Sequence, residues 1–94
     1  MPRMKFSWND KKAASNFAKH RVSFDEATAV FDDQNALIDL DDNDDEERWQ
    51  TIGRSIQGVL FVVYVERGAS TIRIISARRA TRHEEDRYYR QARP

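Results

Sequence analysis

The stretch Val59-Leu60-Phe61-Val62-Val63-Tyr64-Val65 decides the fold class of this 94-residue chain. A continuous apolar run rich in β-branched and aromatic residues predicts a strand that is covered on both faces. A turn near Gln57-Gly58 precedes the run, and Gly68 marks the turn that follows it. We therefore expect this segment to be the central strand of a sheet, joined to its neighbours by short hairpins.

Helix and strand signals on either side of this run define the other elements. Ser23 and Glu26 form a capping box, because the hydroxyl and the carboxylate each satisfy a free backbone N–H group. Thr81 and Glu84 form a second capping box before the last helix. The sequence predicts helices over about 10–20, 23–32 and 81–92, strands at 36–40, 48–55 and 71–79, and a short strand or extended arm at 5–8.

The order of these elements predicts a single α+β domain over residues 1–94. Short connections favour a small, mainly antiparallel sheet of about four strands. Two N-terminal helices should cover one face of this sheet, and one C-terminal helix should follow it. The acidic run from Asp41 to Glu47 should form a loop.

Charge is segregated along the chain, although its formal net charge is zero. Residues 31–47 hold 9 acidic side chains and no Lys or Arg, whereas residues 48–94 hold 10 arginines and 4 acidic side chains. Without the acidic stretch the chain would carry a net charge of +9. This segregation predicts a basic working surface, and the alternative is a solvated acidic loop beside ordinary surface arginines.

Arginines near strand ends are the main candidates for binding phosphate, because guanidinium is a planar and permanently charged fork. Arg48, Arg54 and Arg67 lie near the ends of neighbouring predicted strands, so several could converge at one sheet edge. The structural alternative is that Arg78 or Arg79 pairs with the acidic loop or with Glu84. Period-two alternation places Ile72, Ile74, Ser76 and Arg78 on one face, and Arg73, Ile75, Ala77 and Arg79 on the other.

His20 is the better of two candidate proton-transfer groups, because imidazole titrates nearest to neutral pH. It ends the first predicted helix, so a purely structural interaction with the helix C-terminus is the alternative. His83 lies on an exposed helix and has no expected role. Tyr88 and Tyr89 could stack on bases, or they could pack onto the sheet.

Motifs for other kinds of chemistry are missing. A calcium loop that starts at Asp39 would need glycine at Asp44 and glutamate at Gln50, and the register two residues later fails in the same way. The chain has no cysteine, glycine-rich phosphate loop or nucleophile elbow, so we expect no metal or cofactor. No apolar stretch approaches the roughly 20 residues of a membrane span. The N-terminus lacks an apolar signal core, which predicts a cytoplasmic location.

Four groups of residues, in order along the chain, carry a resemblance to a known family. They are Trp8, Lys12, Asn16 and Lys19-His20; Val22, Phe24, Glu26-Ala27 and Phe31; Glu47-Arg48 with Ile52-Gly53; and Ile75-Ser76-Ala77-Arg78 with Ala80, Glu84 and Tyr88. With these residues the chain resembles the BrnT-type toxins, a branch of the RelE-like ribonuclease superfamily.

The resemblance implies a compact antiparallel sheet with flanking helices, RNA cleavage and neutralisation by a ribbon-helix-helix antitoxin. It also implies that operator DNA is contacted only through the toxin–antitoxin complex. Metal-independent transfer to the RNA's own 2′-hydroxyl would need a base, a proton donor and cations around the phosphorane. We hypothesise charge stabilisation by Arg48, Arg54, Arg78 and Arg79, proton transfer by His20 or Glu47, and RNA contacts from Lys12, Lys19, Arg73 and Tyr88.

Two other interpretations remain open. The chain could be a non-catalytic module that docks an antitoxin-like partner and acts in transcriptional autoregulation. Direct DNA binding ranks last, because no helix-turn-helix signal is present and the arginines lie on predicted strands.

Overall fold

The computed structural model describes residues 4–41 and 47–92, so the predicted acidic loop lies mostly outside the described residues. The predicted capping box at Thr81 forms, because the Thr81 hydroxyl accepts the Glu84 N–H and the Glu84 carboxylate accepts the Thr81 N–H. At Ser23 the hydroxyl accepts the Glu26 N–H as predicted, and the Glu26 carboxylate accepts the Ser23 hydroxyl. The elements in chain order are β1 (Lys5–Ser7), α1 (Asp10–His20), α2 (Phe24–Ala27), the 3-10 helix η1 (Thr28–Asp32), β2 (Leu37–Asp41), β3 (Arg48–Ser55), β4 (Gly58–Arg67), β5 (Thr71–Arg79) and α3 (Arg82–Ala92).

The sheet has five strands in the order β1-β5-β4-β3-β2, with β4 at its centre as predicted. The predicted count of about four strands is wrong, because the short N-terminal segment is a true strand. It pairs in parallel with β5, with Phe6 opposite Ile72, whereas the other neighbours are antiparallel. The α+β class is confirmed, and the sheet is mixed. The predicted second helix is α-helical only as far as Ala27 and continues as η1.

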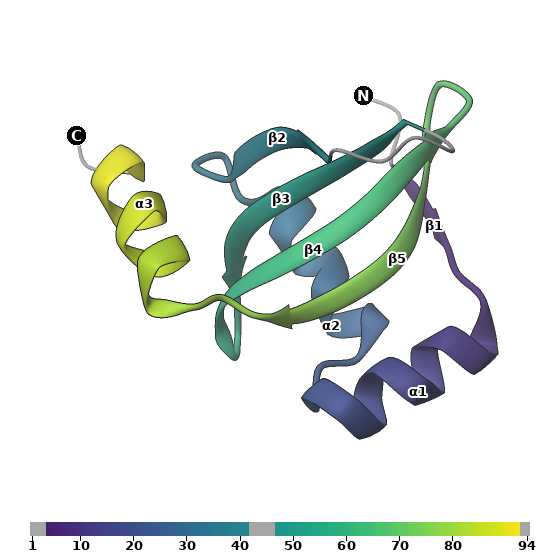
Figure 1. The fold of residues 1–94 in the computed structure, drawn as a ribbon. Helices are drawn as coiled ribbons and strands as arrows, with labels where there is room; N and C mark the ends of the chain where they lie inside the picture. Colours follow the sequence, from purple (N-terminus) through teal and green to yellow (C-terminus); the bar gives the residue numbers. More distant parts are fainter. Residues whose placement is uncertain (1–3, 42–46, 93–94) are drawn as a thin grey trace.

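The main core lies between the sheet and the N-terminal helices. In Figure 1, α2 passes behind the sheet and α1 lies below β5. Phe24, Val30 and Leu60 are fully buried in this core. Gly53 of β3 permits close packing at this point, because an added Cβ would lie 3.0 Å from the Cβ of Val30. These contacts leave the opposite sheet face to α3 and to solvent.

A smaller core cluster fastens α3 to this opposite face, where Tyr88 packs with Leu37, Ile52 and Val59. The Tyr88 hydroxyl donates to Asp33 Oδ2 over 2.5 Å, and the same oxygen accepts the backbone N–H of Arg54 over 2.8 Å. Burial, followed by the bond to Asp33, raises the pKa of Tyr88 to about 12. In the parts of the chain that the structure describes, no helix is long and apolar enough to cross a membrane.

Candidate functional site

A β-bulge in β5 changes which arginines share a face of the sheet. Val63 pairs with Ser76 but Tyr64 pairs with Ile74, so Ile75 is the extra residue of the bulge. The predicted strict alternation through this strand is therefore wrong. Arg73, opposite Val65, lies on the same face as Ser76, whereas the prediction had placed it on the opposite face.

The face that α3 partly covers carries five arginines of the described strands, and we call it the arginine face. Directly opposed residues of neighbouring strands point to the same side, which places Arg78 with Phe61 and Arg54 with Val59. Alternation along β3 brings Arg48 to this side as well. The six-residue step from Arg48 to Arg54 spans roughly 20 Å. The members of this face are Arg48, Arg67 and Arg73 toward one end of the strands, and Arg54 and Arg78 toward the other.

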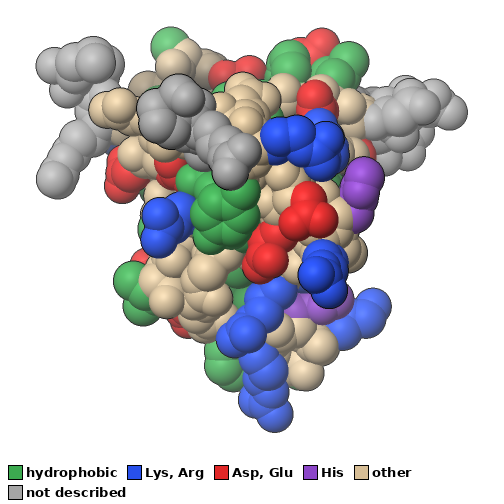
Figure 2. Space-filling model, turned by 90° about the vertical axis from the view of Figure 1, so that its left-hand side faces the viewer, with side chains coloured by type: hydrophobic (Ala, Val, Ile, Leu, Met, Phe, Trp, Pro, Cys, Tyr) green, Lys and Arg blue, Asp and Glu red, His purple; other side chains and the backbone are tan. Residues whose placement is uncertain are grey.

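These arginines lie in two groups at opposite ends of the strands, so they do not all converge at one edge of the sheet. Viewed from the side that carries α3, Lys and Arg side chains surround a small acidic group in Figure 2. Further basic side chains continue from there toward the lower edge, where a histidine lies beside them. Basic groups on this side are thus spread over the surface and interleaved with carboxylates.

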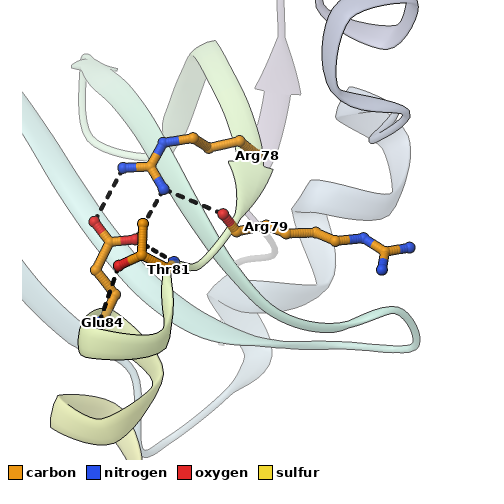
Figure 3. Close-up of polar contacts among 4 residues, drawn as sticks. All are labelled: Arg78, Arg79, Thr81 and Glu84. Carbon is orange, nitrogen blue, oxygen red and sulfur yellow. Dashed lines mark hydrogen bonds and ion pairs between the residues drawn. The ribbon is translucent and has the colours of Figure 1, made fainter.

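Arg78 is held by Glu84, which is the structural alternative that the sequence left open. Its Nη1 and Nη2 donate to Glu84 Oε1 and Oε2 over 2.8 and 3.0 Å (Figure 3). The Phe61 ring lies under the guanidinium, with 4.1 Å from Cζ to the ring centroid. The hydrogen bond from Arg78 lowers the pKa of Glu84, helped by the backbone N–H of Thr81. This clamp ties the start of α3 to the end of β5.

Arg79 belongs to the other side of the sheet. Its side chain extends away from that of Arg78 in Figure 3 and donates to Gln57 Oε1 over 3.3 Å. Gln57 in turn donates to Glu26 of α2. The structure therefore separates the two adjacent arginines that the sequence had grouped together.

Two other predicted site residues also lie apart from a common site. Tyr88 is 1% exposed, so its ring cannot stack on a base in this structure, and the neighbouring Tyr89 is the exposed one at 48%. Glu47 is exposed just before β3 and does not line the pocket described next.

An open pocket of about 240 Å³ brings three predicted residues together between α1 and β5. Lys12, Lys19 and His20 line it because residues four and seven or eight apart share one side of a helix. From β5 come the bulged Ile75 and Ser76, which lies between Arg73 and Arg78 in sequence. The complete lining is Lys12, Ser15, Asn16, Lys19, His20, Ile75 and Ser76.

Asn16 has a structural role that reasoning from the sequence missed. It is 8% exposed, and its side chain binds the backbone of Ala77 in β5 and the carbonyl of Val22. Asparagine is disfavoured inside helices, so its position in the middle of α1 was the available signal.

The pocket combines an imidazole with two ammonium groups, which is a suitable set for proton transfer beside a bound anion. Within residues 4–41 and 47–92, no group of three or more His, Asp or Glu side chains is placed to hold a metal ion. The tested calcium loop includes Asp44, which lies outside the described residues.

Comparison with known proteins identifies the family. The family model described as "Ribonuclease toxin, BrnT, of type II toxin-antitoxin system" matches residues 8–84, which include the pocket and the Arg78 clamp. The chain belongs to the BrnT family. It is similar in fold to the crystal structure of the Brucella abortus ribonuclease toxin BrnT, with a TM-score of 0.65 and 23% sequence identity. That match covers 84% of this chain and 99% of the Brucella chain. No curated protein matches this BrnT family member.

Proposed function

We propose that this BrnT family member is an endoribonuclease, the toxin of a type II toxin–antitoxin pair, and that it cleaves RNA at the pocket between α1 and β5. The family match supports the class of activity. We place the cleavage site at this pocket because His20, Lys12 and Lys19 all line it. Flanking phosphates would extend from there along β5 toward Arg73 and Arg78.

The proposed reaction uses the 2′-hydroxyl of the RNA as its nucleophile. The 2′-oxygen loses its proton to a base and forms a bond to the adjacent phosphorus, while the bond from phosphorus to the 5′-oxygen breaks and that oxygen gains a proton. His20, which lines the pocket, carries out one of these proton transfers. Glu47 ranks second for this role, because it does not line the pocket. Lys12 and Lys19 stabilise the charge that develops on the phosphorane oxygens.

Arg48, Arg54 and Arg73 would attract the RNA backbone electrostatically and guide it across the arginine face, because all three lie on that side of the sheet. Arg78 contributes there as well, but a phosphate must compete with Glu84 for its guanidinium.

We also propose that the partner is a ribbon-helix-helix antitoxin, that it alone contacts operator DNA, and that the toxin acts on RNA in the cytoplasm. The family's place in type II toxin–antitoxin systems supports an antitoxin partner. Purifying the chain together with a candidate antitoxin, and measuring operator binding by each protein and by the complex, tests the proposal. Operator binding by the isolated toxin would contradict it.

The direct experiment incubates the purified protein with end-labelled RNA, with and without a metal chelator. We expect cleavage in both conditions and no cleavage at a position whose ribose is 2′-deoxy, because the nucleophile is then missing. Loss of cleavage in the chelator would contradict the metal-free mechanism. Cleavage at the 2′-deoxy position would contradict 2′-hydroxyl attack.

A further inference from the structure

The outer edge of β5 is completed by a side chain instead of a strand. β1 pairs only with Thr71–Arg73, so beyond Arg73 the neighbouring element on that side of β5 is α1. There the Asn16 amide takes the position of a strand: Nδ2 donates to the Ala77 carbonyl over 2.8 Å, and Oδ1 accepts the Ala77 N–H over 3.2 Å. One planar amide thus satisfies both backbone groups of a single strand residue.

Asn16 also fixes the turn that follows α1. Its Nδ2 donates to the carbonyl of Val22 over 3.0 Å. Between them Arg21 has a left-handed φ of 61°, and its N–H closes the helix on the carbonyl of Phe17. The buried amide therefore joins α1, the turn after it and β5.

These bonds lie beside the pocket residues of both elements. Lys12 and His20 lie one helical turn before and after Asn16, so they share its side of α1. Ala77 directly follows Ser76, which lines the pocket from β5. The two bonds between Asn16 and Ala77 restrict both the sliding of α1 along β5 and its rotation relative to β5. A single bond would leave that rotation free. By fixing Asn16 against Ala77, the two bonds also fix the positions of His20 and Lys19 relative to Ser76.

We propose that Asn16 is a positioning residue for RNA cleavage, acting through the bulged strand to hold His20 and Lys19 opposite Ser76. This inference rests on the proposed ribonuclease function. Asn16 itself contributes its hydrogen bonds to the protein backbone and needs no contact with RNA. Its contribution should therefore appear in the rate of the chemical step and much less in RNA binding.

Two substitutions test the position and the chemistry of the amide. Asn16→Gln keeps every donor and acceptor but adds one methylene, which must displace α1 or break the bonds to Ala77. Asn16→Asp keeps the shape but places an oxygen, in place of the Nδ2 donor, against the carbonyls of Val22 and Ala77. A misplacement of about 1 Å can reduce a rate about 100-fold. We expect kcat on a labelled RNA to fall 10-fold or more in Asn16→Gln, with KM changed less than about three-fold.

A matched control separates positioning from loss of stability. Ser55→Ala removes two comparable bonds, to the Gly58 carbonyl and from the Gln57 N–H, at the β3–β4 turn. Assayed at a temperature where every variant is folded by circular dichroism, Ser55→Ala should cleave at the wild-type rate. If Asn16→Asp does not fold, Asn16→Gln alone decides the question. The inference is overturned by a folded Asn16→Gln with wild-type kcat, by a change in KM alone, or by an equal loss in Ser55→Ala.

An NMR measurement tests the positioning role of Asn16 without relying on RNA cleavage. If the wild-type protein cleaves no RNA, the proposed function fails, but the geometric part of the inference can still be tested. Asn16→Gln should then shift the resonances of the His20 ring and the Ser76 amide, whereas Ser55→Ala should leave both unchanged. Unchanged resonances in Asn16→Gln would overturn the inference independently of activity.

Discussion

Replacing Glu84 by glutamine tests the clamp between Arg78 and α3. The carboxylate accepts two hydrogen bonds from Arg78 and one from the backbone N–H of Thr81. The side chains of Arg78 and Glu84 are 34% and 15% exposed. Hydrogen bonds to charged groups contribute about 1.5–3 kcal/mol, against about 0.5–1.5 kcal/mol for neutral ones. Because the arginine is partly open to solvent, we expect Glu84→Gln to lower the free energy of unfolding by only about 1 kcal/mol at pH 7.

Urea unfolding measures this difference. A chain of this size has a slope near the low end of the usual range, about 1 kcal/mol per M, so the midpoint should fall by about 1 M. The pKa of Glu84 is lowered in the folded state, so its contribution is present above the unfolded pKa, near 4.3, and is lost as pH falls through the folded pKa. The difference between wild type and variant should therefore be much smaller at pH 2 than at pH 7.

Glu85→Gln is the control, because it makes the same change in net charge on the next residue of α3 and leaves the Arg78–Glu84 pair intact. An equal midpoint for Glu84→Gln and wild type at pH 7, or a difference that does not change with pH, would refute the reasoning. Glu84→Gln also removes the carboxylate that competes with phosphate for Arg78. RNA affinity at low salt should therefore rise although stability falls.

Three further substitutions test the packing, each by thermal or urea unfolding. Gly53→Ala should destabilise the protein by about 1–3 kcal/mol, because the new Cβ would lie 3.0 Å from the Cβ of Val30; wild-type stability would show that Val30 can move aside. Tyr88→Phe should cost about 1.5–3 kcal/mol by removing the bond to the Asp33 carboxylate. Because the Tyr88 pKa is raised to about 12, wild-type stability should also fall between about pH 10 and 12, and this fall should be smaller in Tyr88→Phe. Arg21→Gly should raise the midpoint temperature of thermal unfolding, because glycine adopts the left-handed φ of 61° without strain. A lower midpoint would contradict the presence of backbone strain at Arg21.

The elements with strong local signals could be predicted from the sequence. The bounds of β3 and β5 match the predicted 48–55 and 71–79, and β4 contains the apolar run. The caps Ser23 and Thr81 lie where the capping boxes placed them. Each of these features depends on residues that are close together in the chain, so its pattern is visible without the fold.

Features that depend on distant residues could not be predicted in the same way. The three residues of β1 form a strand only because β5 is available beside them. The bulge at Ile75 does interrupt the alternation, because Ile74 and Ile75 stand side by side. Two adjacent apolar residues do not by themselves specify a bulge, and strict alternation therefore placed Arg73 on the wrong face. The pairing of Arg78 with Glu84 and the burial of Tyr88 both depend on how α3 folds back onto the sheet. The roles of the arginines in the candidate site could therefore not be derived from the sequence alone.

The cleavage rates of two histidine variants test the central claim most directly. His20 lines the pocket between α1 and β5, whereas His83 is exposed in the first turn of α3 and serves as the matched control. Loss of a general acid or base typically lowers a rate about 100- to 10,000-fold. We predict a loss in this range for His20→Gln and a wild-type rate for His83→Gln on the same RNA. Full activity in a folded His20→Gln would contradict the assignment of the pocket as the cleavage site.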